Sequence, residues 1–323
     1  MTFLLVLLIL VFSFVLIKSA DMVIVGVRKI SSSLGASSFT IAALVLAIGT
    51  SFPELFVGIT SALENSPNLS LGVVIGSNIA NIALIGSVAA LLTGRIRIKG
   101  EYLRRDVYVA FFAGILPIIL VFDRELSRID GIILLSVYIS YATGFFRERY
   151  EEIGIEQKRE SFFYRFLRRF EKINSKSTKD FALLFVGIAL MLFSADAIVK
   201  SSEALAVGAN VPLFLIGLFA IAVGTSLPEL AFSIKSLRGG EPAMFFGNLL
   251  GSTIANSTLI IGITSIISPI KIIAFNQYVV SVVAFIIIFT SFWIFIRTKR
   301  RLDRWEAVIL LCLYAIFVFF EIR

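Results

Sequence analysis

Two glutamates stand deep inside apolar runs of this chain, where a carboxylate is unusual. Glu54 and Glu229 each follow a proline, within the segments Thr-Ser-Phe-Pro-Glu and Thr-Ser-Leu-Pro-Glu. Nearly all of the other acids, of 22 in total, fall in loops or near the ends of apolar runs. If these runs cross a membrane, both carboxylates lie about 10–14 Å inside it, at a rise of about 1.5 Å per residue. A charge at that depth normally faces the interior of a helix bundle and marks an ion pathway.

The residues beside each glutamate can supply neutral oxygen atoms. Pro53 and Pro228 have no backbone N–H, so each helix should be interrupted within a turn of its acid. Interrupted backbone inside a membrane is tolerated where it lines a cavity. We therefore expect neutral oxygens to gather there, from the carbonyls of Ala47 and Ala222 and the hydroxyls of Thr50, Ser51, Thr225 and Ser226.

Two further apolar segments carry a serine and an asparagine four residues apart, on one helical face. These pairs are Ser77 with Asn81 and Ser252 with Asn256. Such a pair alone usually packs helices together, but its repetition beside a Pro-Glu break favours ligation. A structural ion pair is the alternative for the glutamates, yet the two candidate partners, Lys18 and Lys200, stand near the ends of apolar runs. The pattern therefore predicts a cation site.

The composition restricts the chemistry of that site to oxygen ligands. The chain has no histidine and one cysteine, Cys312, which excludes Cys/His zinc sites, disulfide frameworks and histidine catalysis. Carboxylates with neutral oxygens suit Ca²⁺ and Na⁺, whereas Mg²⁺ dehydrates reluctantly. The sequence shows no nucleophile–base pair and no phosphate-binding loop, so we expect neither an enzyme nor a bound cofactor.

Composition and charge distribution predict an all-α polytopic membrane protein. The apolar share is 58% and the charged share 16%, against about one quarter charged in soluble domains. Apolar windows predict ten transmembrane helices, over residues 3–25, 39–63, 70–94, 107–122, 129–146, 181–200, 211–236, 243–267, 273–296 and 305–321. Because no basic residue precedes the first run, we expect a first span rather than a cleaved signal peptide.

The placement of the basic residues predicts the topology. Most of the 30 lysines and arginines lie in the loops after odd-numbered spans. These loops are predicted to be cytoplasmic, which places both termini outside. The net charge of +8 is therefore a topology signal rather than a nucleic-acid-binding surface.

The chain contains an internal repeat at an offset of 175 residues (229 − 54). Residues 47–55 recur as 222–230 and residues 76–81 as 251–256, and 16 of the 35 positions in 47–81 are identical across the offset. Five predicted spans separate corresponding points, so the second copy enters the membrane from the opposite side, as in many secondary transporters. The predicted domains are a first five-helix repeat (1–146), a cytoplasmic loop with an interfacial amphipathic helix near 159–172 (147–180), and a second, inverted five-helix repeat (181–323).

At these residues the sequence resembles the calcium/cation antiporter superfamily, and most closely its prokaryotic Na⁺/Ca²⁺ exchangers. The two Gly-Thr-Ser-x-Pro-Glu segments with their Gly-Ser-[Asn/Thr]-Ile-Ala-Asn partners look like that family's two alpha-repeats. The resemblance implies that Glu54 and Glu229 bind both ions, and that mainly Na⁺ is bound by the carbonyls of Ala47 and Ala222 and the hydroxyls of Thr50, Ser51, Ser77, Thr225, Ser226 and Ser252. It also implies that spans 1 and 6 slide as a gating bundle against the other eight. Asp21 and Asp196, on those two spans, are predicted to be interfacial polar anchors rather than ligands.

The predicted function is electrogenic Na⁺/Ca²⁺ antiport by alternating access in the plasma membrane. Some family members carry an acid at the position of Asn256, whereas here both Asn81 and Asn256 are amides, which fits a K⁺-independent exchanger with two central carboxylates. The expected partners are Ca²⁺, Na⁺ and the lipid bilayer, without nucleic acid, and the expected functional unit is a monomer. An H⁺/Ca²⁺ antiporter is the closest alternative, because a glutamate can carry a proton instead. A cation channel is less favoured, because the sites interrupt two inverted repeats rather than form a ring around a pore.

Overall fold

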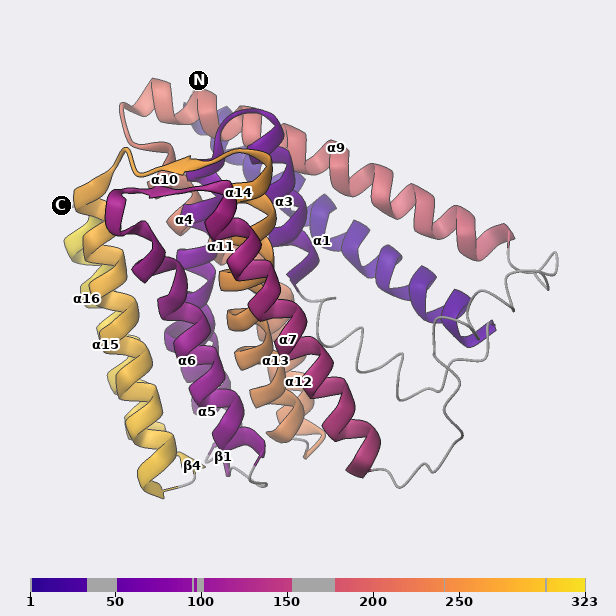
Figure 1. Cartoon of the computed structure of the whole chain (residues 1–323), viewed down its shortest axis with the longest axis vertical. Helices are drawn as coiled ribbons and strands as arrows, with labels where there is room; N and C mark the ends of the chain where they lie inside the picture. The colour runs from indigo at the N-terminus through magenta and orange to yellow at the C-terminus, as the bar shows by residue number, and fades with distance from the viewer. Residues whose placement is uncertain are drawn as a thin grey trace.

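The structure, a computed structural model, describes residues 2–33, 51–94, 96–97, 102–152, 178–240, 242–299 and 301–322. Helices dominate the described chain (Figure 1). Seven of the described helical stretches are long and apolar enough to cross a membrane: Phe3–Gly26, Pro67–Thr93, Asp106–Asp123, Ala182–Ala209, Leu213–Arg238, Met244–Ile267 and Phe275–Thr298. A mostly helical membrane protein is therefore confirmed, while the number of ten spans and the outward termini stay predictions.

The first half of the chain contains six described α-helices, and the second half contains eight. The first six are α1 (Thr2–Ser33), α3 (Phe52–Leu63), α4 (Pro67–Ile79), α5 (Gly86–Thr93), α6 (Tyr102–Leu120) and α7 (Arg128–Glu152). The others are α9 (Thr178–Ala209), α10 (Leu213–Leu215), α11 (Ala222–Thr225), α12 (Leu227–Arg238), α13 (Pro242–Ile254), α14 (Ile261–Ile267), α15 (Phe275–Lys299) and α16 (Arg304–Ile322). A 3₁₀ turn, η3 (Val121–Asp123), follows α6.

Three of the predicted spans are divided rather than uniform helices. The π-helical segments η2 (Ala80–Ile85) and η6 (Ala255–Ile260) separate α4 from α5 and α13 from α14. A third, η5 (Ile216–Ile221), joins α10 to α11. The apolar pattern could not reveal these segments, because a π turn changes the hydrogen-bond register without changing the hydropathy of the run.

The predicted central loop is shorter than 147–180, because helix α7 continues to Glu152 and helix α9 begins at Thr178. Polar residues extend both helices beyond the apolar windows on which the prediction relied. The predicted amphipathic helix near 159–172 lies outside the described residues.

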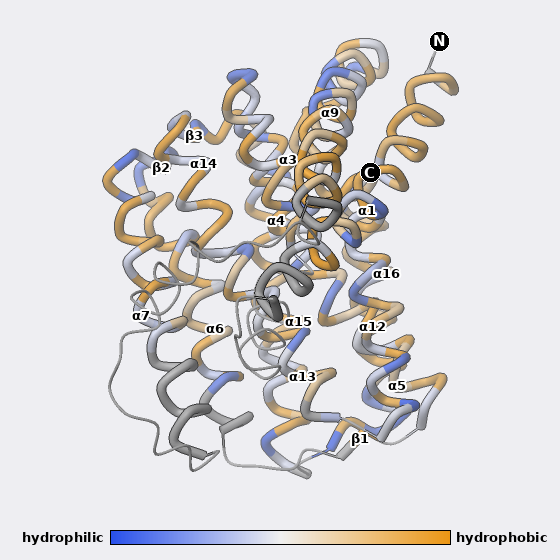
Figure 2. The backbone as a smooth tube through the Cα atoms, turned by 90° about the vertical axis from the view of Figure 1, so that its right-hand side faces the viewer, coloured by the Kyte–Doolittle hydropathy of each residue, from blue (hydrophilic) through white to orange (hydrophobic). Residues whose placement is uncertain are grey.

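Two short antiparallel ladders correct the all-α prediction. Strand β1 (Ile96–Arg97) pairs with β4 (Arg301–Leu302), and β2 (Glu125–Leu126) pairs with β3 (Ile270–Lys271). Two-residue strands carry no alternation signal in a sequence, and they form because loops of the two repeats meet and satisfy each other's backbone groups. Strands β1 and β3 occupy equivalent places in the repeat to within one residue, yet they lie at opposite ends of the molecule (Figure 2).

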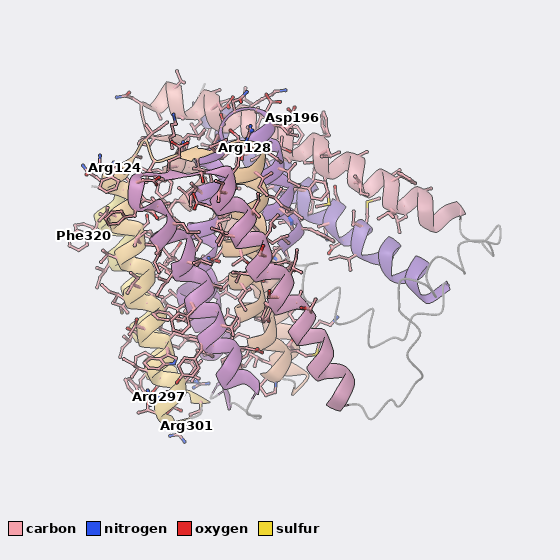
Figure 3. The ribbon with its side chains drawn as sticks, viewed as in Figure 1. Arg124, Arg128, Asp196, Arg297, Arg301 and Phe320 are labelled. Atoms are coloured by element: carbon pink, nitrogen blue, oxygen red, sulfur yellow. The ribbon has the colours of Figure 1, made fainter. Side chains whose placement is uncertain are left out.

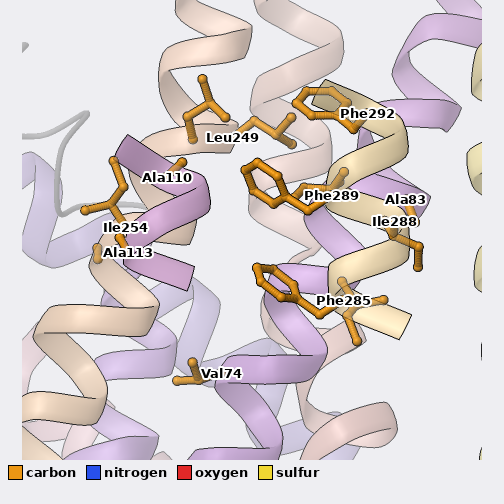
Figure 4. Close-up of a cluster of buried hydrophobic side chains, with 14 of the residues drawn as sticks. Val74, Ala83, Ala110, Ala113, Leu249, Ile254, Phe285, Ile288, Phe289 and Phe292 are labelled. Atoms are coloured by element: carbon orange, nitrogen blue, oxygen red, sulfur yellow. The ribbon is translucent and has the colours of Figure 1, made fainter. Parts of the chain in front are cut away.

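The helices pack around two separate apolar clusters. In the larger cluster, Phe285, Phe289 and Phe292 share one face of α15 and are buried, with successive ring centroids 5.6 and 6.1 Å apart (Figure 4). The smaller cluster includes Leu16 of α1 and Met191 of α9. Helices α1 and α9 pack against each other along their length. Helices α1 and α9 thus form a pair that runs beside the rest of the bundle (Figure 1).

The outer surface suits a bilayer. Large apolar side chains such as Phe112 and Phe185 are two-thirds exposed, and apolar residues colour most helices along their length (Figure 2). Arginines lie at both ends of the bundle, with the Arg124 guanidinium over the Phe275 ring at 4.3 Å and that of Arg297 over the Trp293 ring at 5.2 Å (Figure 3). Arginines beside aromatic rings are typical of the two membrane–water interfaces.

Candidate cation site

Both glutamates occupy the first turn of a helix, directly after a proline. Glu54 is the third residue of α3, behind Pro53, and Glu229 is the third residue of α12, behind Pro228. The residue before α3 and the residue before α12 share one non-helical conformation, with φ −90° and ψ 8° at the first and φ −84° and ψ 0° at the second. In the second repeat the predicted interruption lies between α11 and α12, because Pro228 has no backbone N–H to donate. In the first repeat α3 begins at Phe52, and the residues before Ser51 lie outside the described part of the chain.

The two carboxylates are buried together. Glu54 is 1% exposed and Glu229 is 2% exposed. The Glu54 carboxylate lies beside the hydroxyls of Thr225 and Ser77, and it is close enough to Glu229 for the two like charges to interact. A cation placed between these carboxylates would remove their repulsion, and the positive ends of the half-helices alone supply only partial charges.

No described lysine or arginine neutralises the glutamates. Among the described ion pairs, the Lys200 ammonium lies 2.7 Å from the Asp196 carboxylate and the Lys18 ammonium lies 3.8 Å from that of Asp21. Oxygen Oε2 of Glu54 and Oε2 of Glu229 have no hydrogen-bond partner within the described chain. A buried polar atom normally has a hydrogen-bond partner or a ligand, so these two oxygens are suited to bind a cation.

Asp21 and Asp196 stand apart from this centre. Each pairs with a lysine of its own helix, and both side chains are partly exposed. This geometry agrees with the prediction that the two aspartates are not ligands.

The predicted neutral-oxygen ligands that the structure describes are buried, as the carboxylates are. All of the described candidates are at most 3% exposed: Ser51, Ser77, Asn81, Ala222, Thr225, Ser226, Ser252 and Asn256. Ser51 and Ser226 occupy helix N-caps, where serine normally bonds to the helix backbone, but neither makes a side-chain cap bond within the described residues. Their hydroxyls are thus not used for capping. Ala47 and Thr50 lie outside the described residues.

The Ala222 carbonyl is less free than the sequence predicted. It accepts the Ser226 backbone N–H at 3.1 Å, because the chain makes one more helical turn before the proline interrupts it. The Thr225 hydroxyl lies 3.4 Å from the same oxygen as a second donor, so both lone pairs of this carbonyl face a partner within its own helix. The Thr225 hydroxyl also donates to a carbonyl of its own helix, that of Ile221, at 3.1 Å.

Both candidate asparagines lie in π-helical segments that the sequence did not predict. Asn81 is in η2 and Asn256 is in η6, at equivalent places of the two repeats. Single π turns inside α-helices are frequent at functional sites. Asn81 Oδ1, Asn256 Oδ1 and the Ser77 hydroxyl have no hydrogen-bond partner in the described part of the chain.

Sequence reasoning missed Asn78, which bonds to Asn256 across the repeats. Asn78 lies inside the repeated Gly-Ser-[Asn/Thr]-Ile-Ala-Asn motif. Its only distinguishing feature in the sequence is that the second copy of the motif has Thr253 at this position. The Asn256 Nδ2 group donates to Asn78 Oδ1 at 3.2 Å, and Asn78 Nδ2 donates to the Ser257 hydroxyl at 2.8 Å.

The described residues contain no cluster of three or more His, Cys, Asp or Glu side chains. A site at Glu54 and Glu229 therefore offers two carboxylates and a shell of neutral oxygens. Such a set suits a hard cation that sheds its water. Two carboxylates balance the charge of one divalent ion, and a shell that is otherwise neutral limits the affinity, so that the ion can also be released.

Comparisons with known proteins agree with this arrangement. A family model described as sodium/calcium exchanger protein matches residues 4–147 and 179–323. The chain is 31% identical to the sodium/calcium exchanger MaX1 of Methanosarcina acetivorans, over 98% of this chain and 97% of that protein. It is 28% identical to the putative antiporter CaxA of Alkalimonas amylolytica, over 92% of each chain. Its fold is similar to that of the sodium-calcium exchanger NCX_Mj soaked with Na⁺ and Sr²⁺, with a TM-score of 0.62, 25% identity, and coverage of 98% of this chain and 99% of that one.

Proposed function

The chain belongs to the sodium/calcium exchanger protein family, and from that premise we propose that it couples Na⁺ to Ca²⁺ in electrogenic antiport by alternating access. It is a multi-pass plasma membrane protein, and its homologues are exchangers rather than enzymes. Cation/Ca²⁺ exchange follows from the family. The coupling ion, the charge moved and the access cycle are the parts that we propose.

One observation carries the proposal: two buried carboxylates face each other across the repeats without a described counter-cation. The pair matches the charge of one Ca²⁺. If several Na⁺ ions use overlapping oxygens around the same pair, Ca²⁺ and Na⁺ cannot occupy the centre together, which is the physical basis of antiport. Three Na⁺ ions against two negative charges would leave one positive charge to move with the site.

The proposed ligands divide by charge. Glu54 and Glu229 bind both ions, because a divalent ion gains most from full negative charges. The neutral oxygens serve mainly Na⁺, and they come from Ala47, Thr50, Ser51, Ser77, Ala222, Thr225, Ser226 and Ser252. Asn81 and Asn256 complete the shell as amide oxygens. The burial of the described members supports this set, as does the lack of a described hydrogen-bond partner at Ser77, Ser226 and Asn256 Oδ1.

The proposed topology has ten spans in two inverted repeats, with both termini outside. The opposite placement of the equivalent strands β1 and β3 supports the inversion (Figure 2). Both ends of the chain lie away from the end that carries β1 and β4 (Figure 1), and the loops at the β1–β4 end are rich in arginine. A cytoplasmic β1–β4 end then agrees with the positive-inside rule.

The pair formed by α1 and α9 is proposed to be the sliding element. The two helices pack against each other along their length, and their apolar cluster, which also includes Val57 of α3 and Leu69 of α4, is separate from the main core. The link of this pair to the rest includes an exposed ion pair, in which Lys200 lies 3.9 Å from Glu64, and a partly buried hydrogen bond from the Ser66 hydroxyl to Glu203. Exposed ionic contacts break and re-form at small cost in free energy.

The deciding experiment uses purified protein in proteoliposomes. With no initial Ca²⁺ gradient, an imposed Na⁺ gradient should drive Ca²⁺ uptake, and a pH gradient alone should not. A potassium/valinomycin clamp should change the initial rate with membrane voltage if net charge moves. Uptake that follows only the pH gradient would identify an H⁺/Ca²⁺ antiporter, and flux that never becomes uphill would identify a channel.

A further inference from the structure

One hydrogen-bonded chain crosses between the repeats beside the candidate site. Asn256 Nδ2 donates to Asn78 Oδ1 at 3.2 Å, and Asn78 Nδ2 donates to the Ser257 hydroxyl at 2.8 Å. All three side chains are at most 3% exposed. These hydrogen bonds therefore join α4 of the first repeat to η6 of the second.

These hydrogen bonds make the two repeats unequal. Asn81, the counterpart of Asn256, has no hydrogen-bond partner at either amide atom within the described residues. The counterpart of Asn78 is Thr253, whose hydroxyl donates to the Leu249 carbonyl of its own helix at 3.0 Å and does not cross to the other repeat. The Asn256 amide is thus fixed by a hydrogen bond from the other repeat, whereas the Asn81 amide has no such bond within the described residues.

The bond decides which end of the Asn256 amide remains available. Its Nδ2 group is occupied by Asn78, while its Oδ1 has no described partner. A cation is attracted by the oxygen of an amide and repelled by its NH₂ group, and the two ends have nearly the same shape. Without a partner for Nδ2, a half-turn of the amide would present the wrong end.

The surroundings leave Asn78 few other partners. Asn78 and Ser257 border a crevice whose other walls are mainly apolar, including Leu71, Val74 and Phe285. A buried donor without a partner is costly, so the amides of Asn78 and Asn256 hold each other in place.

We propose that Asn78 is a positioning residue that orients the Asn256 amide, so that its oxygen serves the transported cation. This inference rests on the proposed function, because it assigns a role within the same site. Asn78 itself does not touch the ion. Its action makes Asn256 the fixed amide ligand and Asn81 the adjustable one.

The test compares Asn78→Leu, which removes both hydrogen bonds while keeping the branching of the side chain, in two backgrounds. In the wild-type background we expect the half-saturating Ca²⁺ concentration for Na⁺-driven uptake to rise about threefold to tenfold, the range of one net hydrogen bond. In the Asn256→Asp background the same substitution should have no further effect, because a carboxylate presents oxygen in either orientation. Ser257→Ala should shift the value in the same direction as Asn78→Leu, but less.

Thr253→Val is the matched control, because it removes a buried hydroxyl at the equivalent place of the other repeat. It should leave the half-saturating concentration unchanged. Ca²⁺-induced stabilisation against thermal unfolding, measured in detergent, should follow the same pattern and shows that each variant folds. An equal shift in both Asn256 backgrounds, or no shift with Asn78→Leu, would overturn the inference while Na⁺-driven uptake by the wild type left the proposed function intact. Absence of that uptake in the wild type would overturn the proposed function, and this inference with it.

Discussion

Replacing Glu54 with glutamine isolates the charge on which the proposed site depends. The substitution keeps the length of the side chain and its place in the first turn of α3. It removes one of two buried carboxylates that lie close enough to interact. The matching substitution in the second repeat is Glu229→Gln, and both variants should lose Ca²⁺ transport.

The expected magnitude follows from the burial. Removing one member of a fully buried charge pair costs about 2–5 kcal/mol, which corresponds to a Ca²⁺ affinity about 30- to 4,000-fold weaker. Because the Coulomb energy scales with the product of the charges, Na⁺ binding should lose about half as much free energy. The variant should therefore discriminate less between the two ions as well as bind each more weakly.

The assay is thermal unfolding with and without Ca²⁺, alongside uptake. At a Ca²⁺ concentration of about 100 times Kd, the wild type should gain about 2.7 kcal/mol of stability. With Kd raised about 30-fold, the same concentration should stabilise Glu54→Gln by at most about 0.9 kcal/mol. Without Ca²⁺ the variant should unfold at a higher temperature than the wild type, because the substitution removes the repulsion with Glu229.

Glu321→Gln provides a control for burial alone. Glu321 is 7% exposed, and neither carboxylate oxygen has a hydrogen-bond partner in the described structure, but it lies near the end of α16, away from the breaks. Its substitution should leave Ca²⁺-dependent stabilisation and uptake unchanged. Full Ca²⁺-dependent stabilisation in Glu54→Gln, or loss of it in Glu321→Gln, would refute the assignment of the charge to the site.

Two further predictions concern packing and the neutral ligands. Gly76→Ala would place a Cβ atom 2.1 Å from the Leu218 carbonyl oxygen, so we expect destabilisation by at least about 1–3 kcal/mol in thermal unfolding. The control Gly208→Ala, with open space around the new Cβ atom, should be tolerated. Equal stability of both variants would contradict the close approach of the two helices. Thr225→Val removes a hydroxyl beside the Glu54 carboxylate, and the half-saturating Na⁺ concentration should rise about twofold to tenfold. The control Thr258→Val should leave that concentration unchanged in the same exchange assay. An unchanged Na⁺ dependence in Thr225→Val would remove this hydroxyl from the ligand set.

The position of the site was predictable because its local causes lie in the sequence. Pro53 and Pro228 interrupt their helices wherever the chain folds, since neither has a backbone N–H to donate. A carboxylate in the first turn after such a break, inside an apolar run, has few stable environments other than a polar interior. The repetition of the pattern at a constant offset then indicated two contributions to one site.

Other features depended on which groups meet across the repeats. The π-helical segments that hold Asn81 and Asn256, the β1–β4 and β2–β3 ladders, and the second partner of the Ala222 carbonyl all differ from the sequence prediction. Neither hydropathy nor periodicity reports hydrogen-bond register, so these features had no sequence signal strong enough to predict them.

By itself, the sequence determined the chemical character of the protein: an apolar helical chain without histidine, two deep carboxylates and neutral oxygens placed twice. These properties follow from residue type and spacing, which act locally. Only the tertiary structure decided that the two carboxylates share one buried centre and that Asn78 of one repeat holds Asn256 of the other. Such contacts join residues more than 170 positions apart, and they exist because the packing of the two repeats brings those side chains together.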